Sequence, residues 1–166
     1  MRGSAVRVLR AINDVLATTT KAGVVVAVAV MLVSLAAQVF MRYVFGQALS
    51  WSEELALLLF SWVVLLMTAL GVREGYHVRM DLVAEHLPRR VAAVLAHAIQ
   101  IGVIVVGAFL VRHGWRYFVE TRGSVSAAIG YPIELLHLAA PVTGVLITCF
   151  ALERLLDPIP PAQAER

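Results

Sequence analysis

The chain has 166 residues, of which 60% are hydrophobic and only 15% are charged, and its mean hydropathy is +0.83. Soluble globular domains carry about 45–50% apolar and about 25% charged residues, so this composition excludes an ordinary soluble protein and indicates one membrane domain over residues 1–166. The net charge of +3 is not arranged as a basic stripe with interleaved aromatic residues, which argues against a nucleic-acid partner. Cys149 is the one cysteine, which excludes an intrachain disulfide.

The N-terminal segment AVRVLRAINDVLA (residues 5–17) has two faces at helical spacing. One face is apolar and the other is charged; they consist of Val8, Leu9, Ile12, Val15 and Leu16, and of Arg7, Arg10 and Asp14, respectively. This pattern is typical of an amphipathic helix that lies in the cytoplasmic membrane interface. A simple extension of the first membrane span into water explains it equally well, and both alternatives stay open.

Four stretches without a charged residue are long enough to cross about 30 Å of hydrocarbon, which takes about 20 helical residues. They are Ala22–Met41, Leu55–Val72, Val91–Val111 and Leu135–Leu152. Since backbone polar groups must be satisfied within each span, we expect an all-α integral membrane protein with four helices. Residues 34–37 (SLAA) mimic a cleavage site, but the first apolar run exceeds the core of about 7–15 residues of a signal peptide, which favours an uncleaved anchor.

The distribution of positive charge predicts the orientation of the spans. Ten Lys and Arg residues lie in the N-terminal segment, the second loop and the C-terminal tail, and four lie on the opposite side. The positive-inside rule therefore places both termini in the cytoplasm. Aromatic residues cluster on the outer side, as an interfacial belt requires; they are Trp51, Trp115, Tyr117 and Tyr131.

The segment between the first two spans contains Trp51-Ser52-Glu53-Glu54. Ser50 stands three positions before Glu53, the spacing of a capping box, so we expect Ser50 to cap the second helix. Both glutamates also suit the positive end of that helix, and the Trp51 ring suits headgroup depth.

Two carboxylates exceed what a cap needs, and Arg42 lies just before them in the same connection. Our hypothesis is that Glu53 and Glu54 bond Arg42, which would hold the first span to the second, or bond a partner protein. Paired carboxylates also serve in acid–base catalysis, but nothing nearby supplies a nucleophile or a pocket, so we expect no catalytic residue.

The four apolar runs contain no Asp, Glu, Lys or Arg. An ionisable group inside a membrane usually marks an ion or solute path, and coupled carriers commonly use broken helices in repeated halves. Only Pro141 interrupts a run here, with no matching break elsewhere. The spans therefore indicate a chain that does not carry solute alone, although an autonomous small carrier remains an alternative.

Histidines inside the runs raise the alternative of a haem-binding membrane anchor. His97 and His137 are badly placed to share one iron, because their predicted depths differ by roughly 15 Å; His113 lies nearer the level of His137. We expect no cofactor and interpret the histidines as helix–helix hydrogen-bonding residues, like Gln38, Gln100 and Thr143.

The second loop, REGYHVRMDLVAEHLPRR (residues 73–90), contains four residues of types that bind metals: His77, Asp81, Glu85 and His86. Their spacing fits no strong zinc pattern, so we expect solvated cytoplasmic side chains and no metal site.

Several of these residues together resemble a known family. The matching features are Arg42-Tyr43, Phe45-Gly46, Trp51-Ser52-Glu53-Glu54, Trp62, Gly71, His77-Val78 and Asp81-Leu82, followed by Pro132 and Pro141. They are similar to the small membrane subunit of tripartite ATP-independent periplasmic (TRAP) transporters, the DctQ-like family. The resemblance covers roughly Leu16–Leu156, with the first block the most specific and Met80 a minor departure.

The resemblance implies a non-enzymatic scaffold subunit in the bacterial inner membrane. Its implied partners are a large membrane subunit and a periplasmic substrate-binding protein, which together import small organic acids such as C4-dicarboxylates with an ion gradient, most commonly sodium. As a hypothesis, the partner interface includes Arg42, Tyr43, Trp51, Ser52, Glu53, Glu54, Trp62, His77 and Asp81. The alternative function is a cytochrome b-like membrane anchor of a respiratory enzyme.

Overall fold

The computed structural model describes residues 2–47, 49–75 and 89–156. This part of the chain forms the helices α1 (Arg2–Phe45), α2 (Ser50–Glu74), α4 (Arg89–Glu120), α5 (Glu134–His137) and α6 (Ala139–Leu156). Four helical stretches within it are long and apolar enough to cross a membrane: Leu9–Phe45, Ser50–Glu74, Val94–Glu120 and Glu134–Leu155. The predicted all-α membrane class is therefore confirmed.

The N-terminal segment is continuous with the first span, because α1 runs unbroken for 44 residues. Asn13 and Ala17 on this segment are fully buried, whereas Ile12 and Val15 are 52% and 66% exposed. The apolar face expected from the spacing is therefore divided, because Ile12 and Val15 are exposed while Leu16 packs against the buried core. Asn13 and Ala17 form a small and polar strip that packs inside, since small side chains let neighbouring helices approach closely.

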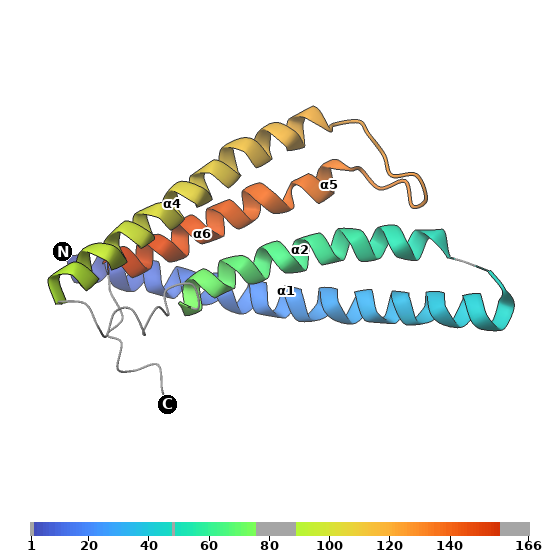
Figure 1. Ribbon diagram of the computed structural model, residues 1–166, viewed down its shortest axis with the longest axis horizontal. Coiled ribbons are helices and arrows are strands. Elements are labelled where there is room, and N and C mark those ends of the chain that lie inside the picture. Colours follow the sequence, from blue (N-terminus) through green and yellow to red (C-terminus); the bar gives the residue numbers. More distant parts are fainter. Residues whose placement is uncertain (1, 48, 76–88, 157–166) are drawn as a thin grey trace.

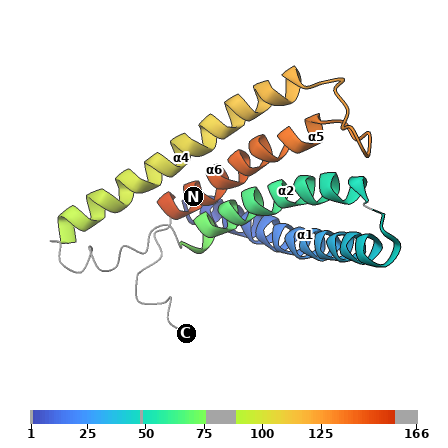
Figure 2. The same cartoon turned by 45° about the vertical axis from the view of Figure 1, so that its right-hand side comes forward.

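The helices lie side by side in the order α1, α2, α6 and α4 (Figure 1). They converge at the end that holds the N-terminus and spread apart toward the other end, and this is also clear after a 45° turn (Figure 2). α6 is the central element. In the span that contains it, Glu134–Leu155, 44% of the residues of an 18-residue apolar stretch are buried, compared with 11% in the spans of α1 and of α4.

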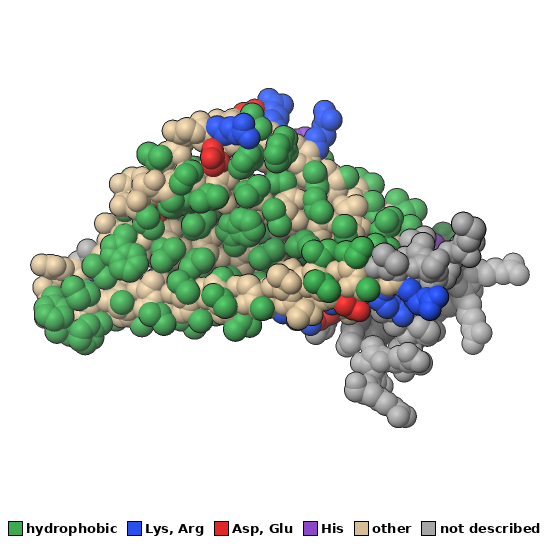
Figure 3. Space-filling model, turned by 180° about the vertical axis from the view of Figure 1, so that it is seen from behind, with side chains coloured by type: hydrophobic (Ala, Val, Ile, Leu, Met, Phe, Trp, Pro, Cys, Tyr) green, Lys and Arg blue, Asp and Glu red, His purple; other side chains and the backbone are tan. Residues whose placement is uncertain are grey.

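Most of the apolar side-chain surface of α1 and α4 is exposed, including Val25, Val33, Val105 and Phe109. Hydrophobic side chains cover most of the face seen in Figure 3, and charged side chains gather at its upper edge and at its lower right. A soluble monomer rarely exposes an apolar surface of this extent. The distribution is that of helices which contact lipid or another membrane protein.

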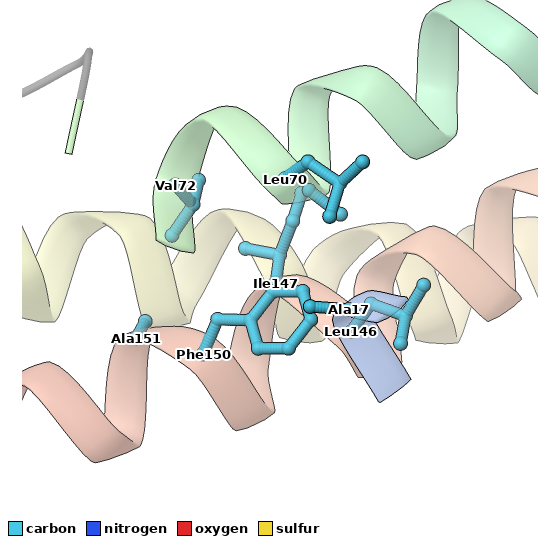
Figure 4. Close-up of a cluster of buried hydrophobic side chains, with 8 residues drawn as sticks. Ala17, Leu70, Val72, Leu146, Ile147, Phe150 and Ala151 are labelled. Atoms are coloured by element: carbon cyan, nitrogen blue, oxygen red, sulfur yellow. The ribbon is translucent and has the colours of Figure 1, made fainter. Parts of the chain in front are cut away.

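The buried hydrophobic core lies at the converging end (Figure 4). It brings together one residue of α1 and several of α2 and α6: Ala17, Ala69, Leu70, Val72, Leu146, Ile147, Phe150 and Ala151. The core places the end of α2 and the end of α6 against the first third of α1, so it fixes the charged residues that surround it.

Glycines bring α4 and α6 into close contact. A Cβ atom added to Gly144 would lie 2.6 Å from the carbonyl oxygen of Gly107, and one added to Gly114 would lie 2.9 Å from the Pro141 nitrogen. Neither site admits a side chain without a backbone shift, and this is the packing expected of small residues in membrane helices.

Pro141 explains why the fourth span is divided into α5 and α6 at Leu138. Proline has no N–H to donate to the carbonyl four positions earlier, here that of His137, and its ring clashes with that carbonyl. The flanking hydrogen bonds persist, from Leu138 N–H to Glu134 and from Val142 N–H to Leu138, at 2.9 and 3.2 Å. The span therefore continues in one direction across the break (Figure 1).

Candidate functional site

Polar side chains join the helices at both ends of the molecule. We call the spread end the Trp51 end; it comprises residues 38–54 and 121–135. The converging end is the Arg73 end, comprising residues 10–21, 73–75 and 149–154. Most of the residues selected from the sequence lie at the Trp51 end.

The start of α2 differs from the expected capping box. Leu49 occupies the N-cap position, Ser50 is the first helical residue, and the cap position makes no side-chain hydrogen bond. Ser50 is thus inside the helix, one residue after the N-cap position, so its hydroxyl does not cap the helix. The fully buried Ser52 takes part instead, because its hydroxyl donates to the Leu49 carbonyl at 2.7 Å.

Glu53 joins α2 to α1. Its Oε1 accepts a hydrogen bond of 2.7 Å from the amide nitrogen of Gln38, a residue of α1 that is only 9% exposed. A hydrogen bond to a charged acceptor is stronger than one between neutral groups. Gln38 therefore forms the interhelical hydrogen bond that we expected of it. Its acceptor is Glu53, for which our hypothesis had named Arg42 or a partner protein.

Glu54 joins α2 to the segment between α4 and α5. Its two carboxylate oxygens accept the backbone N–H groups of Ala128 and Ile129, each at 2.9 Å. Ser126 orders the same turn, because its hydroxyl accepts the N–H groups of Gly130 and Tyr131 at 3.0 and 3.2 Å. Two donors on one carboxylate fix both the position and the orientation of this turn.

Tyr131 belongs to the same turn and is half-buried. Burial raises the pKa of the Tyr131 phenol, and the negative charge of Glu54 raises it further. The segment also closes on itself through an isolated bridge between Val125 and Pro132.

Arg42 pairs with neither glutamate within the described part of the chain; both carboxylates are used by the contacts above. Its side chain is exposed, as is Tyr43, which is 83% exposed, and Trp51, which is 42% exposed. These three residues form one exposed group beside the α1–α2 connection, and their predicted role at a partner interface stays a prediction.

Trp62 lies further along α2 and connects it to α5. Its indole N–H donates to the carbonyl of Leu135 at 3.0 Å. Leu135 lies in the short helix just before the Pro141 break, so the tryptophan holds the divided span against α2.

His77 and Asp81, with Glu85 and His86, lie outside the described residues. The structure therefore does not test the predicted interface role of His77 and Asp81, nor the expectation that this loop holds no metal site. Among the residues that it does describe, no group of three or more His, Cys, Asp or Glu side chains could hold a metal ion.

The histidines in the spans lie at different levels. The ring of His137 lies 5.7 Å from the ring of Tyr117 on α4. His97 is also on α4, but it lies about 30 Å from Tyr117 along the helix at a rise of 1.5 Å per residue. His113 stacks on Phe109 of its own helix, at 3.8 Å between ring centroids. This arrangement does not favour the haem-binding alternative.

Two of the three amide and hydroxyl residues expected between helices have that role. Gln38 binds Glu53, and Gln100 donates to the carbonyl of Ala151 on α6 at 3.1 Å. The expectation is wrong for Thr143, whose buried hydroxyl has no hydrogen-bond partner among the described residues.

The contacts among the charged groups of the Arg73 end were not predicted from the sequence, which assigned Arg10 and Asp14 only to the charged face of a helix. The fully buried Asn13 donates to the Glu153 carboxylate at 2.6 Å and to the Cys149 carbonyl at 3.2 Å. Lys21 pairs with Glu74 at 2.6 Å, and Arg73 pairs with Asp14. These contacts could have been suspected from Asn13, a polar residue on the same helical face as the small residue Ala17.

The hydrogen bonds and ion pairs at both ends join one helix to another or to the 121–133 segment. Chemically, this arrangement fixes the relative positions of the spans and leaves their apolar faces exposed.

Comparison with known proteins identifies the family. The family described as "Tripartite ATP-independent periplasmic transporters, DctQ component" matches residues 31–160. The small permease protein SiaQ of a sialic acid TRAP transporter in Vibrio cholerae is 27% identical over 78% of this chain and 75% of its own length. The small permease protein DctQ of a C4-dicarboxylate TRAP transporter in Rhodobacter capsulatus is 34% identical over 63% of this chain.

A third relative is much longer than this chain. The sialic acid TRAP transporter permease protein SiaT of Haemophilus influenzae is 32% identical over 68% of this chain, and the matched part is 18% of that permease. The chain likewise spans 47% of the length of the Rhodobacter capsulatus relative. With the family match covering most of the four-helix region, the chain belongs to the DctQ family, the small membrane component of TRAP transporters.

Proposed function

We propose that this chain is the transmembrane scaffold of an ion-gradient-driven importer of small organic acids. The match of residues 31–160 to the DctQ component carries the proposal, and TRAP permease subunits are transport proteins rather than enzymes. The relatives named for sialic acid and for C4-dicarboxylates support small carboxylates as the solute class. Sodium is the coupling ion that we propose.

The proposed partners are a large membrane subunit and a periplasmic substrate-binding protein. The long SiaT relative supports the first, because a segment similar to this chain makes up only 18% of that permease. The exposed apolar faces of α1 and α4 offer the surface that a large membrane partner needs. We place the group of Arg42, Tyr43 and Trp51 at the periplasmic side, where it borders the interface with the partners.

The orientation follows from the charge distribution, with both termini in the cytoplasm and the protein in the bacterial inner membrane. Ten of the 14 Lys and Arg residues then face the cytoplasm. In this orientation the Arg73 end is cytoplasmic and the Trp51 end, with the turn held by Glu54, is periplasmic.

Purification of the tagged chain in detergent tests the proposal. The protein is co-expressed with the large hydrophobic protein encoded by a neighbouring reading frame, and we expect the two to purify together. Uptake of a radiolabelled carboxylate into proteoliposomes should then require the large subunit and the binding protein. Sodium-driven uptake by the isolated chain would contradict a scaffold role.

A pair of substitutions tests the part played by the glutamates. Changing Glu53 and Glu54 to alanine should weaken co-purification or uptake, since both fix the periplasmic end of α2. The control is Glu120→Ala, because Glu120 bonds Arg116 on its own helix at 2.7 Å. Unchanged assembly and uptake in the double variant would remove these residues from the proposed interface.

A further inference from the structure

The Arg73 end contains a cavity of about 340 Å³ between α1, α2 and α6. Four basic and three acidic side chains line it, together with the ring of Phe150. The cavity does not belong to the proposed transport function, and its position at the end of the spans puts it at the level of lipid headgroups.

Each of the three acidic side chains already has a basic partner. The pairs are Lys21 with Glu74 at 2.6 Å, Arg10 with Glu153 at 3.8 Å, and Arg73 with Asp14. Glu153 also accepts the hydrogen bond from the buried Asn13. Because four basic and three acidic side chains line the cavity, its formal net charge is +1.

The fourth basic side chain is Arg154. Its Nε atom is buried and has no hydrogen-bond partner among the described residues. Its guanidinium lies against Gly75, close enough that a Cβ atom there would overlap it, 2.6 Å from Nη1. Gly75 ends α2 with a φ of +79°, a backbone conformation that favours glycine.

The buried Nε of this half-buried guanidinium lacks an acceptor among the described residues, which indicates a missing acceptor. Arginine presents its donors in a planar fork that matches the oxygens of a phosphate group. Basic pockets between membrane helices on the cytoplasmic side are suited to anionic lipid headgroups. A single surplus charge also matches a phosphodiester, which carries one negative charge.

We propose that this cavity binds a phosphate group through Arg154, with the phosphodiester of an anionic lipid as the preferred source. Arg73 and Phe150 also line the cavity, with the Arg73 guanidinium 5.8 Å from the Phe150 ring centroid. The bound phosphate contacts α6 and lies beside charged residues of α1 and α2. It therefore stabilises the end at which the helices converge.

The test uses the full-length chain, stripped of lipid in a neutral detergent, and measures its unfolding temperature. Dioleoyl phosphatidylglycerol at about ten times its half-saturating concentration should raise that temperature by about 3–6 °C. Phosphatidylcholine with the same acyl chains, which has no net charge, should not. Inorganic phosphate, compared with chloride at equal ionic strength, reveals whether the free anion binds instead.

Two variants connect the effect to Arg154. Arg154→Gln should weaken phosphatidylglycerol binding about tenfold or more, because it removes the charge and the fork. Arg154→Lys keeps the charge without the fork and should bind with intermediate affinity. The matched control, Arg116→Gln at the other end of the molecule, should keep the full shift.

The outcomes separate the possible sources. Stabilisation by phosphatidylglycerol that is lost in Arg154→Gln supports a lipid site, and stabilisation by inorganic phosphate alone supports a site for the free anion. If neither stabilises the protein, or if both arginine variants respond like the unsubstituted chain, the proposal is overturned. Native mass spectrometry of the unsubstituted protein gives an independent count of bound phosphatidylglycerol, so the result does not depend on the folding of the variants.

Discussion

The carboxylate of Glu54 accepts the backbone N–H of Ile129 at 2.9 Å, although the two residues stand 75 positions apart in the chain. This contact fastens the connection between the third and fourth spans to the first turn of the second. The helices spread apart at this end (Figure 1), so the contact bridges elements that are not held there by the hydrophobic core.

Glu54→Gln should release the 121–133 segment from α2. Glutamine offers one acceptor oxygen where the carboxylate offers two charged ones, so one of the N–H groups of Ala128 and Ile129 loses its partner. Amide hydrogen exchange at both residues should become several-fold faster. Glu120→Gln, which removes a carboxylate bonded one turn away on α4, should leave exchange in this segment unchanged; equal acceleration in both variants would refute the contact.

Asn13→Leu should destabilise the Arg73 end by about 1–3 kcal/mol, because it leaves the Glu153 carboxylate and the Cys149 carbonyl without the amide donor. Thermal unfolding in detergent measures the change. Combining it with Glu153→Leu should recover part of the loss, since the carboxylate that lost its amide donor is then removed as well. Thr18→Ala, at an exposed position of α1, is the control.

Gly144→Ala should destabilise the protein by about 1–3 kcal/mol, since its Cβ would meet the backbone oxygen of Gly107. Gly102→Ala on α4 provides the matched comparison, because nothing lies within 4 Å of a Cβ atom there. That variant should be neutral or more stable by up to about 1 kcal/mol, owing to the higher helix propensity of alanine. Equal effects of the two substitutions on the unfolding temperature would contradict the close contact of α4 with α6.

Trp62→Phe should cost about 1 kcal/mol of stability, since phenylalanine keeps an aromatic side chain but lacks the N–H that donates to the Leu135 carbonyl. Exchange of backbone amides near Ala139, just after the break in the fourth span, should accelerate. The control is Trp115→Phe, which changes an exposed ring on α4 and should alter neither the stability nor the amide exchange near Ala139. A Trp62→Phe variant as stable as its parent would show that packing alone holds α5 to α2.

The sequence alone determined the class, the four spans and the family of this protein. Long apolar runs in a membrane leave the helix as the solution for the backbone, and the block from Arg42 to Asp81 carried the family resemblance. Gln38 and Gln100 were correctly assigned to interhelical contacts, because a polar amide in an apolar helix needs a partner.

Only the tertiary structure decided which polar groups meet. Glu54 lies near Arg42 in the chain, yet its partners come from residues 128 and 129, and Glu53 binds Gln38 instead. Ser50 had the spacing of a cap, but the helix began one residue too early for its hydroxyl to serve. Local spacing fixes what a residue can do within its own helix. The partners across helices depend on how α6 packs between α2 and α4, and that packing follows from shape contacts such as Gly144 against Gly107, which a single sequence does not reveal.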